Sequence, residues 1–192
     1  MDYPNRRLDG FLSDIASASV TPAGGTAGAV VGAIGTACCE MVCIHLETAD
    51  AAVDADLVAR REELGAQRAR MLTLAEADAE VVDELFATAG ADRSTVKRSV
   101  GVPLSLAETC VEALETAAAV TGSADRPVVA DAATGSYFLH AALRSALFTA
   151  RNNLEYVDDA SFVEDAERRT TDLEASADRA LEGVLANVGG SP

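Results

Sequence analysis

The sequence predicts an all-α protein, an up-and-down bundle of about six helices. Alanine dominates the 49% of residues that are apolar, aromatic residues make up only 4%, and there is no Trp, a composition that favours helix over strand. No stretch of β-branched and aromatic residues alternates with polar ones. Apolar residues instead recur at helical spacing between Pro and Gly breaks, and 192 residues suit one domain, residues 1–192, with a sizeable core.

A short first helix is expected from Asn5 to Ser19. Its apolar side chains recur at helical spacing: Leu8, Phe11, Leu12 and Ile15. The break at Val20-Thr21-Pro22 should end this helix, because proline cannot continue one.

The second helix is expected within the segment from Thr21 to Leu46, which is nearly all small or apolar. Its entry is rich in glycine and is formed by Pro22, Gly24, Gly25 and Thr26. Proline suits the first turn of a helix, and glycines leave the backbone N–H groups uncovered. Uncovered N–H groups at the positive end of a helix attract anions and carbonyl oxygens, so this entry could face a ligand.

Three interpretations of this segment remain open. It is long enough to span a membrane, but Glu40 interrupts it and its alanine and glycine content makes it weakly hydrophobic. It could be a core helix whose Gly28, Gly32 and Gly35 let a neighbouring helix cross closely. The third interpretation adds a ligand at the N-terminal end of that core helix.

A long acidic helix is expected from about Ala51 to Ala89. Its apolar stripe consists of Leu57, Leu64, Met71, Leu74, Val81 and Leu85. Asp78 falls within this stripe, so its carboxylate is aimed at the core. Burial raises the pKa of a carboxyl group, as a general acid or base working near neutrality requires. A structural, hydrogen-bonded Asp78 or a solvated position in a groove is the alternative.

Three further helices complete the predicted bundle. One spans Arg93 to Val120 with Pro103 inside it, one spans Pro127 to Val157, and the last begins at Ser161, in a capping box, and runs to Gly189-Gly190. The Pro127 to Val157 segment carries polar side chains among its alanines: Asp131, His140, Arg151, Asn152 and Asn153.

The charge of the chain indicates its solvent. The formal net charge is −16, from 31 acidic and 15 basic residues, and Lys97 is the only lysine. Arginine in place of lysine and an acidic surface are expected of a halophilic protein, because molar salt screens the self-repulsion. Such a surface disfavours nucleic acid and anionic membranes as partners, since no basic patch is present to bind phosphates.

The four cysteines are expected to be buried, reduced thiols. They lie in apolar helical segments, and no secretory signal begins the chain, so a cytoplasmic location is predicted. A metal site at Cys39, Cys43 and His45 is the alternative. The spacing disfavours it, because His45 points away from Cys43 and the pattern matches no zinc motif.

Several segments, taken in order, match one enzyme family. These are Pro22-Ala23-Gly24-Gly25-Thr26, Met41-Val42, Glu76-Ala77-Asp78-Ala79, Val102 to Thr109, Asp131, and Thr149 to Leu154. With them the chain resembles the cyclodeaminase/cyclohydrolase family of folate enzymes. That family includes the cyclodeaminase half of formiminotransferase-cyclodeaminase and the stand-alone methenyltetrahydrofolate cyclohydrolases.

The resemblance implies a helical homodimer with a folate in a cleft near the dimer interface. The enzyme would interconvert 5,10-methenyltetrahydrofolate with 10-formyltetrahydrofolate, or it would form 5,10-methenyltetrahydrofolate from 5-formiminotetrahydrofolate with release of ammonia. Neither reaction would use a cofactor or a metal. By matching positions, Asp78 would be the catalytic residue. The substrate-binding residues would be Pro22, Gly24, Gly25, Thr26, Asp131, Arg151 and Asn153.

Helix geometry limits how two of these residues can act. Asp131 and Asn153 are 22 residues apart in one helix, so they lie about 33 Å apart and cannot line one site within one subunit. Two antiparallel copies of that helix across a dimer axis would bring them together. A negative charge early in a helix is the simpler role for Asp131.

The sequence also departs from the family pattern. Ala23 replaces a glycine in the entry turn, and Thr149 replaces an asparagine. The acidic stretch Glu47 to Asp50 replaces a basic turn suited to the glutamate tail of a folate, whose binding would then move to arginines such as Arg60, Arg61 or Arg151. The alternative function is a non-catalytic oligomerisation or folate-binding protein on the same fold.

Overall fold

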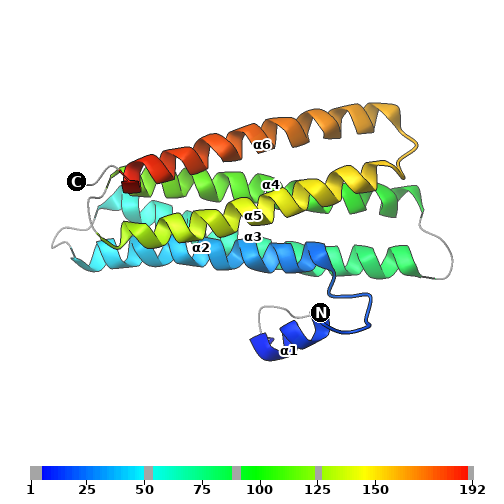
Figure 1. Ribbon diagram of the computed structural model, residues 1–192, viewed down its shortest axis with the longest axis horizontal. Coiled ribbons are helices and arrows are strands. Elements are labelled where there is room, and N and C mark those ends of the chain that lie inside the picture. Colours follow the sequence, from blue (N-terminus) through cyan, green and yellow to red (C-terminus); the bar gives the residue numbers. More distant parts are fainter. Residues whose placement is uncertain (1–5, 50–53, 88–91, 124–126, 190–192) are drawn as a thin grey trace.

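The computed structural model describes residues 6–49, 54–87, 92–123 and 127–189, and this part of the chain is helical without strands. The helices are α1 (Leu8–Ile15), α2 (Gly24–Ala49), α3 (Ala55–Phe86), α4 (Arg93–Gly122), α5 (Val129–Leu154) and α6 (Ala160–Gly189). In Figure 1, α2 to α6 lie side by side as long rods and α1 stands apart below them. The predicted all-α bundle of about six helices is confirmed.

Side-chain pairs between helices show that successive long helices run in opposite directions. Thr26 at the start of α2 bonds to Asp78 near the end of α3, and Glu47 at the end of α2 pairs with Arg61 near the start of α3. The beginnings of α2, α4 and α6 and the ends of α3 and α5 therefore meet at one end of the bundle, the right-hand end of Figure 1. The predicted glycine-rich entry lies at this end.

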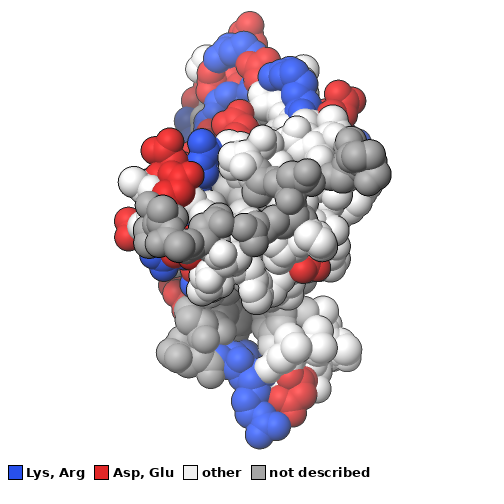
Figure 2. Space-filling view, turned by 90° about the vertical axis from the view of Figure 1, so that its left-hand side faces the viewer, with Lys and Arg blue, Asp and Glu red and all other residues white. Residues whose placement is uncertain are grey.

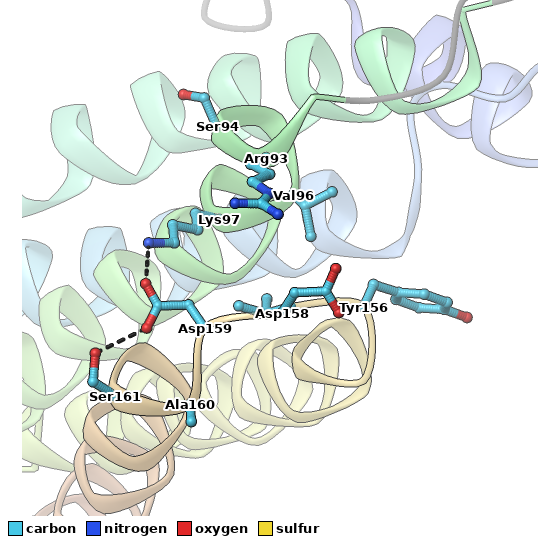
Figure 3. Close-up of a pocket in the computed structure, with 10 residues that line it drawn as sticks. Arg93, Ser94, Val96, Lys97, Tyr156, Asp158, Asp159, Ala160 and Ser161 are labelled. Atoms are coloured by element: carbon cyan, nitrogen blue, oxygen red, sulfur yellow. Dashed lines mark hydrogen bonds and ion pairs between the residues drawn. The ribbon is translucent and has the colours of Figure 1, made fainter.

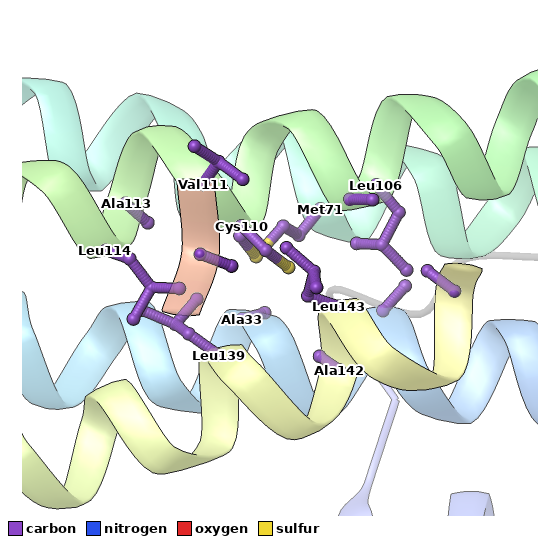
Figure 4. Packing of buried hydrophobic residues seen from close by; sticks show 14 of the residues in the cluster. Ala33, Met71, Leu106, Cys110, Val111, Ala113, Leu114, Leu139, Ala142 and Leu143 are labelled. Carbon is purple, nitrogen blue, oxygen red and sulfur yellow. The ribbon is translucent and has the colours of Figure 1, made fainter. Parts of the chain in front are cut away.

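Glycines bring α2 and α5 into backbone contact. A Cβ on Gly35 would meet the carbonyl oxygen of Gly135 at 2.6 Å, so neither position tolerates a side chain. Met71 and Cys110 lie against Gly32 of α2, and Figure 4 shows them in the core with Leu143. Gly24–Ala49 is long and apolar enough to cross a membrane, yet half of its most apolar stretch is buried inside the bundle. That packing is the close helix crossing that the small residues of α2 predict.

Helix α1 is shorter than the sequence predicts and projects from the bundle. It covers Leu8–Ile15 and buries Phe11, while Leu8 and Leu12 are exposed. Figure 2, which views the bundle from the left-hand end of Figure 1, shows acidic and basic side chains interspersed over the upper part of that face. On the face shown there, basic side chains do not gather into a patch.

The start of α6 corrects one sequence expectation. The helix begins at Ala160, one residue before the predicted capping box at Ser161. Asp159 acts as the cap, because its carboxylate accepts bonds from the Phe162 backbone N–H at 3.2 Å and from the Ser161 hydroxyl at 2.8 Å. The Asp159 carboxylate thereby satisfies one of the N–H groups that the first turn of α6 leaves without a helical partner.

Candidate functional site

Asp78 lies on the buried face of α3, as its position in the apolar stripe predicts. Met71 and Val81 of the same stripe are 0% and 2% exposed, and Asp78 itself is only 9% exposed. The carboxylate faces the first turn of α2, where the glycine-rich entry lies. The structure thus brings together the two features that the sequence singles out independently.

The first turn of α2 holds the carboxylate. The Thr26 hydroxyl donates to Asp78 Oδ2 at 2.8 Å, and the Thr26 backbone N–H also bonds to this carboxylate. Gly25 lies against it so closely that a Cβ on Gly25 would overlap the carboxylate oxygens. Glycine is therefore required at position 25 because a side chain would occupy the space of the Asp78 carboxylate.

Burial and hydrogen bonding act on the Asp78 pKa in opposite directions. Burial is the larger effect and raises the pKa above its ordinary value, since it penalises the charged form. The bonds from the Thr26 hydroxyl and backbone N–H stabilise the charged form and offset part of this rise. The result is a carboxyl group with a raised pKa that keeps two fixed donors, which suits proton transfer.

Pro103 determines how Asn153 is oriented beside this site. Proline has no N–H, so the carbonyl oxygen of Ser99, four residues earlier in α4, loses its helical donor. The Asn153 side chain of α5 supplies that donor, with Nδ2 at 2.7 Å from the Ser99 oxygen. This bond fixes the amide of Asn153 and leaves its oxygen and its second N–H for a ligand.

These residues line a cavity of ≈ 240 Å³ at the meeting end of the helices. Gly24, Gly25 and Asp78 form one side of it, and Asn153 and Thr149 another. Apolar and small side chains complete the lining: Ala23, Val81, Val82, Leu85, Phe86, Val102 and Pro103. The cavity therefore combines one proton-transfer group and a few fixed polar groups with apolar walls, as small-molecule sites do.

The other predicted site residues lie outside this cavity. Pro22 is buried in the segment before α2, where the Thr21 hydroxyl bonds to Asp83 at 3.1 Å. Arg151 is exposed and pairs with Glu174 of α6 at 2.6 Å. Asp131 is exposed in the first turn of α5, at the opposite end of the bundle from Asn153, as the 22-residue separation predicts.

Sequence reasoning missed Ser99 and Phe86 as cavity residues. The signal for Ser99 was present, because the residue four positions before an internal helical proline carries a carbonyl without a helical donor. Phe86 lies in the last turn of α3, and its place at the cavity depends on how α3 packs against α4. No pattern within α3 alone predicts that placement.

A second, larger cavity of ≈ 860 Å³ lies at the same end of the bundle (Figure 3). It lies between the first turns of α4 and the connection from α5 to α6. Lys97 Nζ forms an ion pair with Asp159 at 2.7 Å across this cavity and lies 5.1 Å from the ring centre of Phe162. The Lys97 ammonium and the bonds from Ser161 and Phe162 hold the pKa of Asp159 far below its usual range.

The cysteines and histidines form no metal centre in the described part of the chain. Within the described ranges no three His, Cys, Asp or Glu side chains converge as a metal site would require. Cys39 and Cys43 are buried thiols, whereas His45 is exposed on the other face of α2. Burial raises the pKa of Cys39 to about 12 and that of Cys43 to about 11, so both stay protonated near neutral pH.

Comparison with known proteins gives consistent results. A family model described as formiminotransferase-cyclodeaminase matches residues 7–172. A methenyltetrahydrofolate cyclohydrolase of Methylorubrum extorquens is 28% identical over an aligned length of 202 residues, and the match covers 96% of this chain and 91% of that protein. The crystal structure of a formiminotetrahydrofolate cyclodeaminase from Thermotoga maritima shares the fold, with a TM-score of 0.91 at 19% identity, covering 97% of this chain and 98% of that one.

Proposed function

The chain belongs to the formiminotransferase-cyclodeaminase family, and from that membership we propose that it is a folate enzyme whose Asp78 cavity hydrolyses 5,10-methenyltetrahydrofolate to 10-formyltetrahydrofolate. The observation that carries the proposal is the buried Asp78 carboxylate, held by Thr26 at the glycine-rich start of α2. The similarity to a cyclohydrolase over 96% of the chain supports this reaction as the one to test first.

The reaction needs one group that takes and returns a proton. The Asp78 carboxylate takes a proton from water as the water oxygen bonds to the methenyl carbon. The bond from this carbon to N5 then breaks, N5 receives the proton from Asp78, and the hydroxyl proton leaves to solvent as the formyl C=O forms. The Thr26 hydroxyl and N–H stabilise the carboxylate before the first transfer and again after the second.

The remaining cavity residues position the substrate. Asn153, fixed by the Ser99 carbonyl, offers an amide to the polar edge of the pterin. The walls formed by Val81, Phe86 and Pro103 bury its apolar faces and exclude bulk water, which strengthens the polar contacts inside. Together they would hold the one-carbon bridge beside Asp78.

A second reaction fits the same groups, and the family description names it. In a cyclodeaminase, N10 of 5-formiminotetrahydrofolate attacks the formimino carbon and ammonia leaves. Asp78 would carry the N10 proton to the departing nitrogen. Both reactions can be followed in molar KCl by the absorbance of 5,10-methenyltetrahydrofolate. The cyclohydrolase reaction removes this compound, and the cyclodeaminase reaction forms it. If neither reaction runs faster than it does without the protein, the chain is a non-catalytic protein on this fold.

We also infer that the protein forms a homodimer through α2 and α5. These two helices leave seven large apolar side chains exposed: Val31, Ile34, Met41, Ile44, Tyr137, Phe138 and Phe148. Antiparallel copies of α5 across a two-fold axis would bring the partner's Asp131 toward the cavity end that holds Asn153. Light scattering after gel filtration in molar KCl tests this, and a mass of one chain contradicts it.

We infer the solvent and the compartment from the composition and the cysteines. The net charge of −16 supports a protein adapted to high salt, and the reduced cysteines support a cytoplasmic location. Both belong to the proposal and set the conditions of every assay.

A further inference from the structure

We propose that the larger cavity, beside Arg93 and Tyr156, binds the aminobenzoyl-glutamate tail of the substrate, with Arg93 donating to a tail carboxylate. This inference rests on the proposed folate reaction and extends it, because it assigns the substrate's anionic end to residues outside the Asp78 cavity. The tail differs chemically from the pterin: it has an aromatic ring followed by two or more carboxylates.

The first argument is size. The Asp78 cavity holds ≈ 240 Å³, below the roughly 300–1,000 Å³ of pockets that enclose a whole ligand of this kind. The second cavity holds ≈ 860 Å³ and opens at the same end of the bundle. A folate seated with its one-carbon bridge at Asp78 must therefore extend beyond the first cavity.

The second argument is adjacency. Val96 lines the larger cavity, and Ser99, one turn along α4, lines the smaller one. Asn153 of α5 lines the smaller cavity, and Tyr156, three residues on, lines the larger. One helical turn is about 5.4 Å, so the two cavities are neighbours along α4 and along the end of α5 with the turn that follows it.

The third argument is charge. The chain has 31 acidic and 15 basic side chains, so carboxylate partners for an arginine are plentiful. Arg93 nevertheless has no ion pair with any residue in the described ranges, while Lys97 beside it is already paired with Asp159. Figure 3 shows the Arg93 side chain extending into the cavity, above the connection that carries Asp158. An unpaired guanidinium is suited to bidentate binding of a carboxylate.

The walls of this cavity fit the rest of the tail. Val96 and Val157 give it an apolar wall, and the exposed ring of Tyr156 can stack on a benzoyl ring. Asp158 is the one lining carboxylate without a partner in the described part of the chain, and it opposes a bound anion. Removing its charge should therefore strengthen tail binding, a result that an uncharged ligand or a cation would not give.

The test uses N-(4-aminobenzoyl)-L-glutamate as the probe, with calorimetric titration of the full chain in molar KCl. Arg93→Gln should weaken its binding about 10-fold or more, since a hydrogen bond between charged groups is lost. Asp158→Asn should tighten it several-fold. Arg179→Gln is the matched control, because Arg179 of α6 is another arginine without an ion pair in the described ranges and lines neither cavity. Equal affinities for the Arg93 and Arg179 variants, or weaker binding by the Asp158 variant, would overturn the proposal.

Kinetics separate this inference from the proposed reaction. Methenyltetrahydropteroate lacks the glutamate, so the wild type should show a higher KM for it than for methenyltetrahydrofolate. Arg93→Gln should remove that difference by raising the KM for methenyltetrahydrofolate to that for methenyltetrahydropteroate. A KM difference that persists in the variant refutes the tail site while the reaction stands. Arg93-dependent binding of the probe by a protein that does not turn over methenyltetrahydrofolate refutes the reaction while the tail site stands.

Discussion

Replacing Pro103 by Ala should stabilise the protein and weaken its activity at the same time. The proline removes the N–H that would bond to Ser99, and its ring pushes that carbonyl away from the helix axis, toward Asn153. Alanine restores the N–H and lets the carbonyl turn back into the helix. Asn153 then loses the bond that fixes its amide.

The substitution should raise the free energy of unfolding and lower kcat/KM. A proline inside a helix costs about 3 kcal/mol relative to alanine. Pro103 is buried, and the substitution removes two ring methylenes worth about 0.8 kcal/mol each. The free energy of unfolding should therefore rise by about 1 kcal/mol. Releasing the Asn153 amide costs about 1 kcal/mol of substrate positioning, which lowers kcat/KM about 5-fold.

Denaturant unfolding and methenyl absorbance, both in molar KCl, measure the two effects. Asn153→Ala is the matched variant, because it removes the same contact from the other side. Adding Pro103→Ala to it should cost less activity than the two single losses combined, since both changes break one bond while Pro103 also lines the cavity. A Pro103→Ala protein that is less stable than the wild type, or that keeps its full kcat/KM, would refute the reasoning.

Three further predictions concern the same site and the surface. Gly25→Ala should abolish activity while the chain still folds, because the new Cβ displaces the Asp78 carboxylate. Thermal unfolding and turnover, measured on the same variant, check this prediction, and a fully active variant contradicts it. Burial raises the pKa of Asp78, so the folded protein holds the Asp78 proton more tightly than the unfolded chain does. The free energy of unfolding should therefore fall as the pH rises from the pKa of an unfolded aspartate, about 4, through the raised pKa of the folded protein. Asp78→Asn should therefore be more stable than the wild type at pH 7, a difference that disappears below about pH 4 in unfolding curves, and equal stabilities at pH 7 would refute it. The unfolding midpoint should rise with KCl, because screening relieves the repulsion within a chain of net charge −16, and full stability in dilute buffer would exclude a halophilic adaptation.

The fold could be predicted from the sequence because local sequence patterns are enough to indicate a helix. Apolar residues at helical spacing, with Pro and Gly breaks, are enough to place six helices within a few residues of their observed bounds. The ends were less predictable, as the cap at Asp159 shows. Several side chains there can serve as the cap, and the three-dimensional contacts decide which one does.

The site could be predicted only in part. Asp78 and the entry formed by Gly24, Gly25 and Thr26 stand out as local anomalies, a carboxylate in an apolar stripe and glycines before a core helix. Their contact, and the cavity with Asn153, depend on how α2, α3 and α5 pack, which no local pattern contains. Placing Arg151 outside the cavity likewise required knowing which face of α5 meets α6.

The most direct test of the proton-transfer role is the turnover of methenyltetrahydrofolate by Asp78→Asn in molar KCl. The amide keeps the shape of the carboxylate but cannot accept a proton, so kcat should fall at least about 100-fold while KM changes little. In the wild type, kcat should rise with pH through the raised pKa of Asp78, and the variant should lack that rise. An Asp78→Asn protein that turns over substrate at the wild-type rate would remove Asp78 from the mechanism and contradict the account.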